Sequence, residues 1–157
     1  MLYVAEAMLV AAKEQSRSLT PQQLVKLVYL AHGWSMALHD QPLIDANVEA
    51  WELGVMIPTL YRATQQFGRE VIDPSLVGSV SARYLPENVH QLIRSVFEKY
   101  GHLDGPSLSY LTSQANSPWG VVRASNMTKP VIPNSLICSH FLKQLDTRKK
   151  HHVTARP

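Results

Sequence analysis

Seven histidines and a single cysteine are the residues of this sequence whose types suggest metal chemistry. His32 and His39 lie seven residues apart in a segment with helical periodicity. That spacing puts them on roughly one face, but about 10 Å apart along the axis. The distance is too large for the two imidazoles to share one metal ion, and Cys138 alone excludes a cysteine-rich zinc site. We therefore expect no metal site and no cofactor.

Acid–base chemistry has one candidate pair of carboxylates, Glu49 and Glu52, which flank Trp51. The sequence places no second catalytic group near them, so we expect Glu49 to be a structural hydrogen-bond acceptor for backbone or histidine donors. His32 lies in an apolar stripe, which favours a hydrogen-bonded core histidine. Ser117 has no assignable base, and glycine-rich phosphate loops, GxSxG and HExxH are absent. An enzyme that uses His32 and Glu49 as a polar pair stays open as an alternative.

The three tryptophans are the remaining large side chains that suggest a function. Trp34 lies in an apolar stripe next to the one that holds His32, on the same predicted helix, and we expect it in the core. Trp51 and Trp119 lie in or beside irregular segments, and such amphipathic anchors are enriched at protein interfaces. Core packing is the alternative for both. Together with Glu49 and Tyr61, they are our candidate partner-binding residues.

Helices must position these residues, because apolar residues recur at three- and four-residue spacing over most of the chain. The best-defined helix spans about residues 20–39. Thr20 can cap it, Pro21 suits its first position and Gln23 completes a capping box. Apolar residues cover nearly its whole circumference, which predicts a buried central helix. Further helices are expected at about 2–14, 58–67 and 86–100, and from about 107 and 134.

Two segments lack helical periodicity. In residues 40–57, Pro42 marks a turn, residues 48–53 favour a short extended piece, and Gly54 permits an unusual backbone angle or a close approach. Residues 69–84 alternate weakly and indicate a loop or one short hairpin. About six helices around the central one predict an all-α fold, a compact bundle.

The positive charge of the chain is concentrated at its C-terminus. The net charge is +3 over 157 residues, and residues 143–157 alone carry +4, which leaves −1 for the remainder. A phosphate-tracking surface needs clustered Lys and Arg on the folded domain, so nucleic acid is not an expected partner. We expect a helical domain over residues 1–145 and a basic, disordered tail over 146–157.

The sequence also bears on the compartment. No apolar run approaches the roughly 18–20 residues that span a bilayer, so no membrane contact is expected. Residues 1–12 are apolar but include Glu6 and lack a leading basic cluster, which indicates a first helix rather than a signal peptide. A single cysteine favours a reducing compartment. We expect a cytoplasmic protein.

Several motifs together resemble a known family. Residues 19–45 read LTPQQLVKLVYLAHGWSMALHDQPLID, and they are followed by Val48-Glu49-Ala50-Trp51, Gly54, Pro58, Leu60-Tyr61, residues 107–112 and Asn116-Ser117-Pro118-Trp119. This order resembles the Panacea domain of SocA-like antitoxins and phage-associated GepA-type proteins, over about residues 1–145. The resemblance makes Lys26, Tyr29, His32, Trp34, Pro42, Gly54, Pro58 and Ser117 family-motif positions.

The resemblance implies an antitoxin that neutralises a cognate toxin, encoded by an adjacent gene, through direct protein–protein binding. Two alternatives from the same resemblance are an adaptor that delivers the toxin to a ClpXP-type protease and a phage-associated interaction protein without a toxin. Family members usually have Gly-Pro-Val at residues 54–56 and often a histidine at the position of Ser113. Because this chain differs from the family at these positions, we expect no polar site to be inherited from the family there. It specifies neither the toxin nor the oligomeric state.

Overall fold

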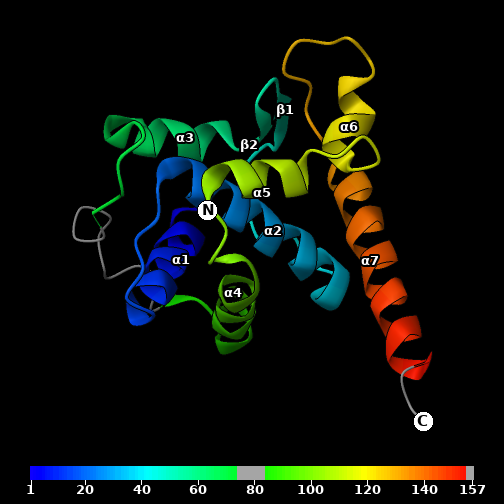
Figure 1. Ribbon diagram of the computed structural model, residues 1–157, viewed down its shortest axis with the longest axis horizontal. Coiled ribbons are helices and arrows are strands. Elements are labelled where there is room, and N and C mark those ends of the chain that lie inside the picture. The colour runs from blue at the N-terminus through cyan, green and yellow to red at the C-terminus, as the bar shows by residue number, and fades with distance from the viewer. Residues whose placement is uncertain (74–83, 155–157) are drawn as a thin grey trace.

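The computed structural model describes residues 1–73 and 84–154, which form seven α-helices, one 3-10 helix and a two-stranded sheet (Figure 1). The all-α class predicted from the sequence is confirmed. In chain order the elements are α1 (Leu2–Glu14), α2 (Pro21–His39), β1 (Glu49–Trp51), β2 (Gly54–Met56), α3 (Pro58–Thr64), the 3-10 helix η1 (Gln65–Phe67), α4 (Glu87–Tyr100), α5 (Gly105–Thr112), α6 (Pro118–Arg123) and α7 (Asn134–Thr154).

Helix α2 is the buried centre of the fold, as its sequence predicted. The capping box forms: the Thr20 hydroxyl accepts from the Gln23 N–H, and the Gln23 side chain accepts from the Thr20 N–H at 3.0 Å. Because these bonds satisfy amides that a helix start leaves open, α2 begins at a defined residue. It contacts α1, α3, α4, α5, α7 and β2, so most of the other elements pack on it.

Helix α7 is held on α2 by one aromatic side chain. Phe141 is buried and makes edge contacts with Tyr29 and Trp34, with ring centroids 5.9 and 5.1 Å apart. Gly33 lies between these two aromatic residues in the sequence, and a Cβ atom there would overlap the Phe141 ring. The missing side chain is what lets the Phe141 ring approach the α2 backbone.

A hairpin forms where the sequence indicated only a short extended piece. β1 and β2 pair antiparallel, with Ala50 opposite Val55 and Trp51 opposite Gly54. Gly54 has φ +118°, a conformation that favours glycine, so the unusual backbone angle expected there is confirmed. The hairpin predicted near 69–84 lies mostly outside the described residues, and residues 69–73 contain no strand.

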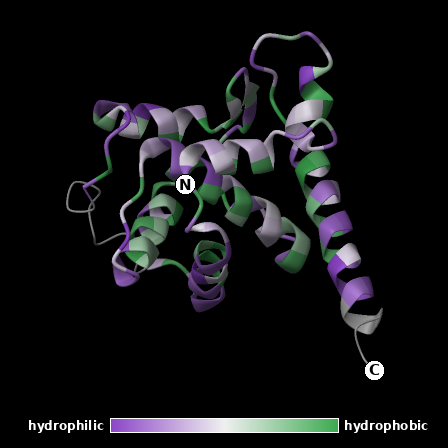
Figure 2. Ribbon diagram, viewed as in Figure 1, coloured by the Kyte–Doolittle hydropathy of each residue, from purple (hydrophilic) through white to green (hydrophobic). Residues whose placement is uncertain are grey.

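The C-terminal segment differs from the predicted disordered tail, because α7 continues to Thr154. Residues 143–154 contain neither glycine nor proline, so nothing in the sequence ends the helix earlier. Arg148 also anchors this part of α7: its guanidinium donates to the Tyr100 hydroxyl at 3.2 Å and lies 4.3 Å from the centroid of the Trp34 ring. Figure 2 shows hydrophobic and hydrophilic residues interspersed along α7, as expected for a helix with one packed face.

The close approach of α7 to α2 gives a test of the packing. We expect Gly33→Ala to lower the free energy of unfolding by about 1–3 kcal/mol, because the new methyl group displaces the Phe141 ring. In a Phe141→Leu background the same substitution should cost at least about 1 kcal/mol less, since the smaller side chain leaves room. Urea denaturation of the four proteins measures this coupling. Strictly additive effects would contradict the predicted contact.

Candidate functional site

Three aromatic side chains from different elements meet at one surface, and we call Trp51, Tyr61 and Trp119 the aromatic cluster. The Trp51 and Tyr61 rings make an edge contact, with centroids 5.7 Å apart. The Trp119 indole N–H donates to the Trp51 carbonyl at 2.8 Å. These contacts join β1, α3 and α6. The structure therefore brings together three of the four candidate partner-binding residues.

Glu49, the fourth candidate, adjoins the same cluster. Its Oε2 accepts from the Trp51 indole N–H at 2.7 Å. This bond is charge-assisted and fixes the plane of the Trp51 ring. Glu49 is a hydrogen-bond acceptor, as the sequence predicted, but its donor is the neighbouring indole rather than a backbone or histidine group.

Two cations lie over the cluster. The Lys129 ammonium is 4.1 Å from the centroid of the Trp51 ring, and the Arg123 guanidinium is 6.0 Å from that of Trp119. Both distances allow a cation–π attraction. Within residues 1–73 and 84–154, neither cation forms an ion pair with a carboxylate. Each cation therefore lies over a ring face rather than in an ion pair with a carboxylate of the described residues.

The segment that carries Lys129 is tied to the hairpin by backbone hydrogen bonds. The Ala50 N–H donates to the Pro130 carbonyl at 2.8 Å, and the Ile132 N–H donates to the Val48 carbonyl at 2.7 Å. Val131 forms an isolated bridge with Glu49. Residues 130–132 therefore extend the small sheet by one short stretch of chain, and this pairing is what sets Lys129 above Trp51.

A cavity and exposed apolar side chains accompany the cluster. The cavity has a volume of about 430 Å³ and is lined by Glu52, Arg123, Asn126, Met127, Thr128 and Lys129. Leu53, at the hairpin turn, is 84% exposed, and Met127 and Val131 are also exposed. Aromatic rings, an exposed methionine and an arginine match the residue types that are enriched at protein interfaces. Sequence reasoning missed Lys129 and Arg123, since nothing in the local pattern links them to Trp51.

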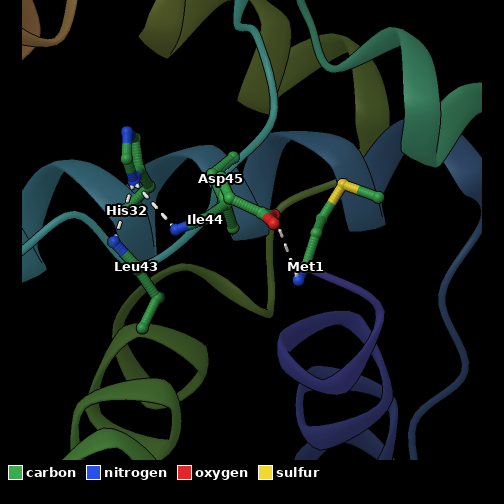
Figure 3. Close-up of polar contacts among 5 residues, drawn as sticks. All are labelled: Met1, His32, Leu43, Ile44 and Asp45. Atoms are coloured by element: carbon green, nitrogen blue, oxygen red, sulfur yellow. Dashed lines mark hydrogen bonds and ion pairs between the residues drawn. The ribbon is translucent and has the colours of Figure 1, made fainter.

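His32 has a different role from the catalytic alternative. It is completely buried, and its Nδ1 accepts from the N–H groups of Leu43 and Ile44 at 3.1 and 3.3 Å (Figure 3). Because Nδ1 accepts, the ring proton is on Nε2, which donates to the Asn134 side-chain oxygen at 3.0 Å. Burial lowers the pKa of His32, which favours this neutral form.

The predicted polar pair of His32 and Glu49 is not formed. The imidazole bonds to the 43–44 backbone and to α7, whereas the Glu49 carboxylate bonds to an indole. The irregular segment between α2 and β1, residues 40–48, carries Glu49 away from His32 to the hairpin, where its side chain turns to Trp51. Within the described residues, no group of three or more His, Cys, Asp or Glu side chains gathers to hold a metal ion.

Lys26 is another buried polar residue of α2. Its ammonium donates to the Val55 carbonyl, and burial lowers its pKa to about 8. A Cβ atom at Gly54 would lie 3.2 Å from the Lys26 Nζ and 2.8 Å from the Ser113 Oγ. Ser113 Oγ is buried and has no hydrogen-bond partner among the described residues. Lys26, Gly54 and Ser113 thus pack at one point where α2 and α5 meet the hairpin.

The remaining family-motif residues are structural in different ways. Tyr29 and Trp34 pack on Phe141 in the core. Ser117 caps α6 by accepting from the Gly120 N–H at 3.3 Å, while its hydroxyl donates to the Gln114 carbonyl, so it starts a helix. Pro58 occupies the first turn of α3, and Pro42 lies exposed in the loop after α2. No helix within the described part of the chain is long and apolar enough to cross a membrane.

The burial of Lys26 predicts a stability that changes with alkaline pH. Its folded pKa of about 8 lies below the ordinary 10.5, so between these values the unfolded chain binds more protons. The free energy of unfolding should therefore rise from pH 8 to 10, by at most about 1.4 kcal/mol per pH unit. Lys26→Met should flatten this rise, and Lys13→Met, on the exposed face of α1, should not. Equal slopes in all three proteins would contradict the prediction.

The burial of His32 predicts that the stability of the protein also changes at acidic pH. Its folded pKa lies below the ordinary 6.5, so its contribution is complete above pH 6.5 and is lost as the pH falls below it. We expect the melting temperature to drop between pH 7.5 and 5.5, and His32→Gln to reduce that drop while lowering stability at pH 7.5. His39→Gln, exposed on the same helix, is the control. Part of the drop should remain, because burial and Lys143 also lower the pKa of His140.

The sequence of this chain is similar to known proteins. A family profile described as "Antitoxin SocA-like, Panacea domain" matches residues 24–120, from the first turn of α2 into α6. Antitoxin SocA of Caulobacter vibrioides (strain NA1000 / CB15N) is similar, with 25% identity over 107 residues. That alignment covers 63% of this chain and 57% of SocA, so the chain spans little more than half of this relative. No solved structure matches the chain. The profile covers more than half of the residues, and the chain belongs to the SocA-like antitoxin, Panacea domain family.

Proposed function

We propose that this protein is an antitoxin that neutralises a cognate protein toxin, encoded by an adjacent gene, by binding it directly. The observation that carries the proposal is the aromatic cluster with the Lys129 ammonium stacked on Trp51. The similarity to a protein named Antitoxin SocA supports the antitoxin role. In this proposal both proteins act in the cytoplasm of the same cell.

The composition of the surface supports a protein partner. Tryptophan, tyrosine and arginine are the residues that most often dominate binding energy at protein interfaces. Here Trp51, Tyr61 and Trp119 are held rigidly by contacts with one another, so little side-chain entropy is lost on binding. Leu53 projects from the hairpin turn and supplies an apolar contact beside them.

The charged residues around the aromatic cluster indicate which kind of protein segment could bind there. Lys129 and Arg123 lie over the rings, and Glu52 lines the same cavity. A toxin segment with an apolar anchor and a nearby carboxylate would satisfy both cations, whereas a strongly basic segment would meet them unfavourably. Complementary charge of this kind contributes mainly to the association rate and to partner choice.

The proposal predicts which substitutions release the toxin. With the product of the neighbouring gene co-expressed, wild-type protein should restore growth and co-purify with it. Lys129→Glu and Leu53→Asp change exposed side chains and should each weaken binding about tenfold or more without loss of helicity. Lys149→Glu and Val71→Asp are matched controls on exposed positions outside the cluster, and they should bind like wild type.

The same experiment separates the possible modes of action. Equal loss in the cluster variants and the controls would contradict a role for this surface. A neighbouring product that is harmless alone and never binds would contradict the antitoxin function. If growth is restored while the toxin level falls, and deletion of a ClpXP-type protease abolishes rescue, the protein acts as an adaptor for degradation rather than by binding alone.

A further inference from the structure

A second cavity lies between the C-terminal half of α2, α4 and α7. Its volume is about 140 Å³, and its lining comprises Trp34, Leu38, Leu92, Ser95, Val96, Lys99, Tyr100, Leu145 and Arg148. Each helix contributes residues spaced three or four apart, so each presents one face to the cavity. Figure 1 shows α4 and the end of α7 at the lower edge of the molecule, whereas the hairpin and α6 are at the top. The cavity is therefore separate from the aromatic cluster.

The size and polarity of this cavity define what fits inside it. Most of the lining is apolar, with Trp34, Leu92 and Val96 buried beneath it and Leu38 half exposed at its edge. Sites for cofactors and drug-sized ligands enclose about 300–1,000 Å³. A cavity of about 140 Å³ holds roughly one branched apolar side chain. The occupant is thus a single anchor of a larger molecule.

The rim of the cavity is positively charged. The Arg148 guanidinium lies 4.3 Å from the Trp34 ring centroid, and the Lys99 ammonium lies 6.0 Å from the same centroid. No carboxylate lines the cavity, and among the described residues neither cation takes part in an ion pair. Arg148 donates one N–H group to the Tyr100 hydroxyl, and a guanidinium has further N–H groups that can bind a carboxylate. Two cations beside an apolar cavity are complementary to a carboxylate next to an apolar group.

We propose that this cavity binds a segment of a partner protein in which a branched apolar side chain stands next to an acidic residue. The apolar side chain enters between α2, α4 and α7, and the carboxylate pairs with Arg148 and Lys99 at the rim. A nucleic acid is a poorer fit, because it would present no side chain for the cavity and would need a longer track of cations. The inference does not depend on the toxin or on the aromatic cluster.

Short peptides test both halves of the proposal. The probe is the blocked hexapeptide acetyl-Gly-Ser-Leu-Asp-Ser-Gly-amide, titrated into the isotopically labelled full chain and followed by backbone amide shifts in NMR. We expect saturable shifts at Ser95, Lys99 and Leu145 in the millimolar range. Replacing the peptide's aspartate by asparagine, or its leucine by alanine, should each weaken binding about fivefold or more.

Variants of the protein locate the charge effect. Lys99→Gln and Arg148→Gln should each weaken binding of the Leu-Asp peptide about fivefold. Neither variant should change the affinity for the Leu-Asn peptide by as much. Arg148→Lys is a second variant for the case that loss of the guanidinium perturbs α7. It keeps the positive charge and should keep most of the preference for the Leu-Asp peptide. Lys143→Gln is the matched control, because it removes the same charge from a residue of α7 that lines a different cavity.

Three outcomes would overturn the proposal. They are an absence of saturable shifts at the cavity, equal binding of the Leu-Asp and Leu-Asn peptides, and an equal effect of Lys143→Gln and Arg148→Gln. The last would indicate general attraction by the basic helix. None of these results bears on toxin binding by the aromatic cluster, so failure here is distinguishable from failure of the proposed function.

Discussion

The buried imidazole of His32 is the interaction on which the arrangement of the chain depends. It accepts from two backbone amides of the segment after α2 and donates to the first residue of α7, so it connects three parts that are distant in sequence. An unpaired polar group at a completely buried position would cost about 1–3 kcal/mol, and here both ring nitrogens are satisfied. These bonds hold the segment after α2 and the first residue of α7 against the same point of α2.

Helix α2 distributes its few special residues so that each fixes a different neighbour. Lys26 bonds to the β2 carbonyl, His32 to α7 and the following loop, and Gly33 admits the Phe141 ring. Gln23 and Ser35 add hydrogen bonds to the Leu103 and Gln41 carbonyls, and most of the other buried positions of α2 are apolar. Hydrophobic burial therefore drives the collapse around α2, while its polar contacts and Gly33 select one arrangement of the surrounding elements.

Much of the helical architecture could be predicted, because caps and apolar periodicity are local signals. Thr20, Pro21 and Gln23 marked the start of α2, and its apolar circumference marked its burial. The helical end of α7 was missed, since its anchor is Arg148 stacked on Trp34, a contact far apart in sequence. For the same reason Trp51, Tyr61, Trp119 and Glu49 were recognisable as candidates by residue type, whereas Lys129 was not. Its place over Trp51 depends on pairing of residues 130–132 with the hairpin, which no local pattern encodes.

The two surfaces are built on rigid supports, and this bears on how they bind. Residues 130 and 132 form backbone hydrogen bonds with the hairpin, and Asn134, which follows them closely, is hydrogen-bonded to His32. The segment that carries Lys129 and the start of α7 are therefore held in place together. From there α7 runs along α2 to Arg148, which rests on Trp34. Because both cations over the cluster and both cations at the α7 cavity already lie on ring faces, a partner need not order them. In the two proposed interactions, less binding energy would then be lost to ordering these side chains.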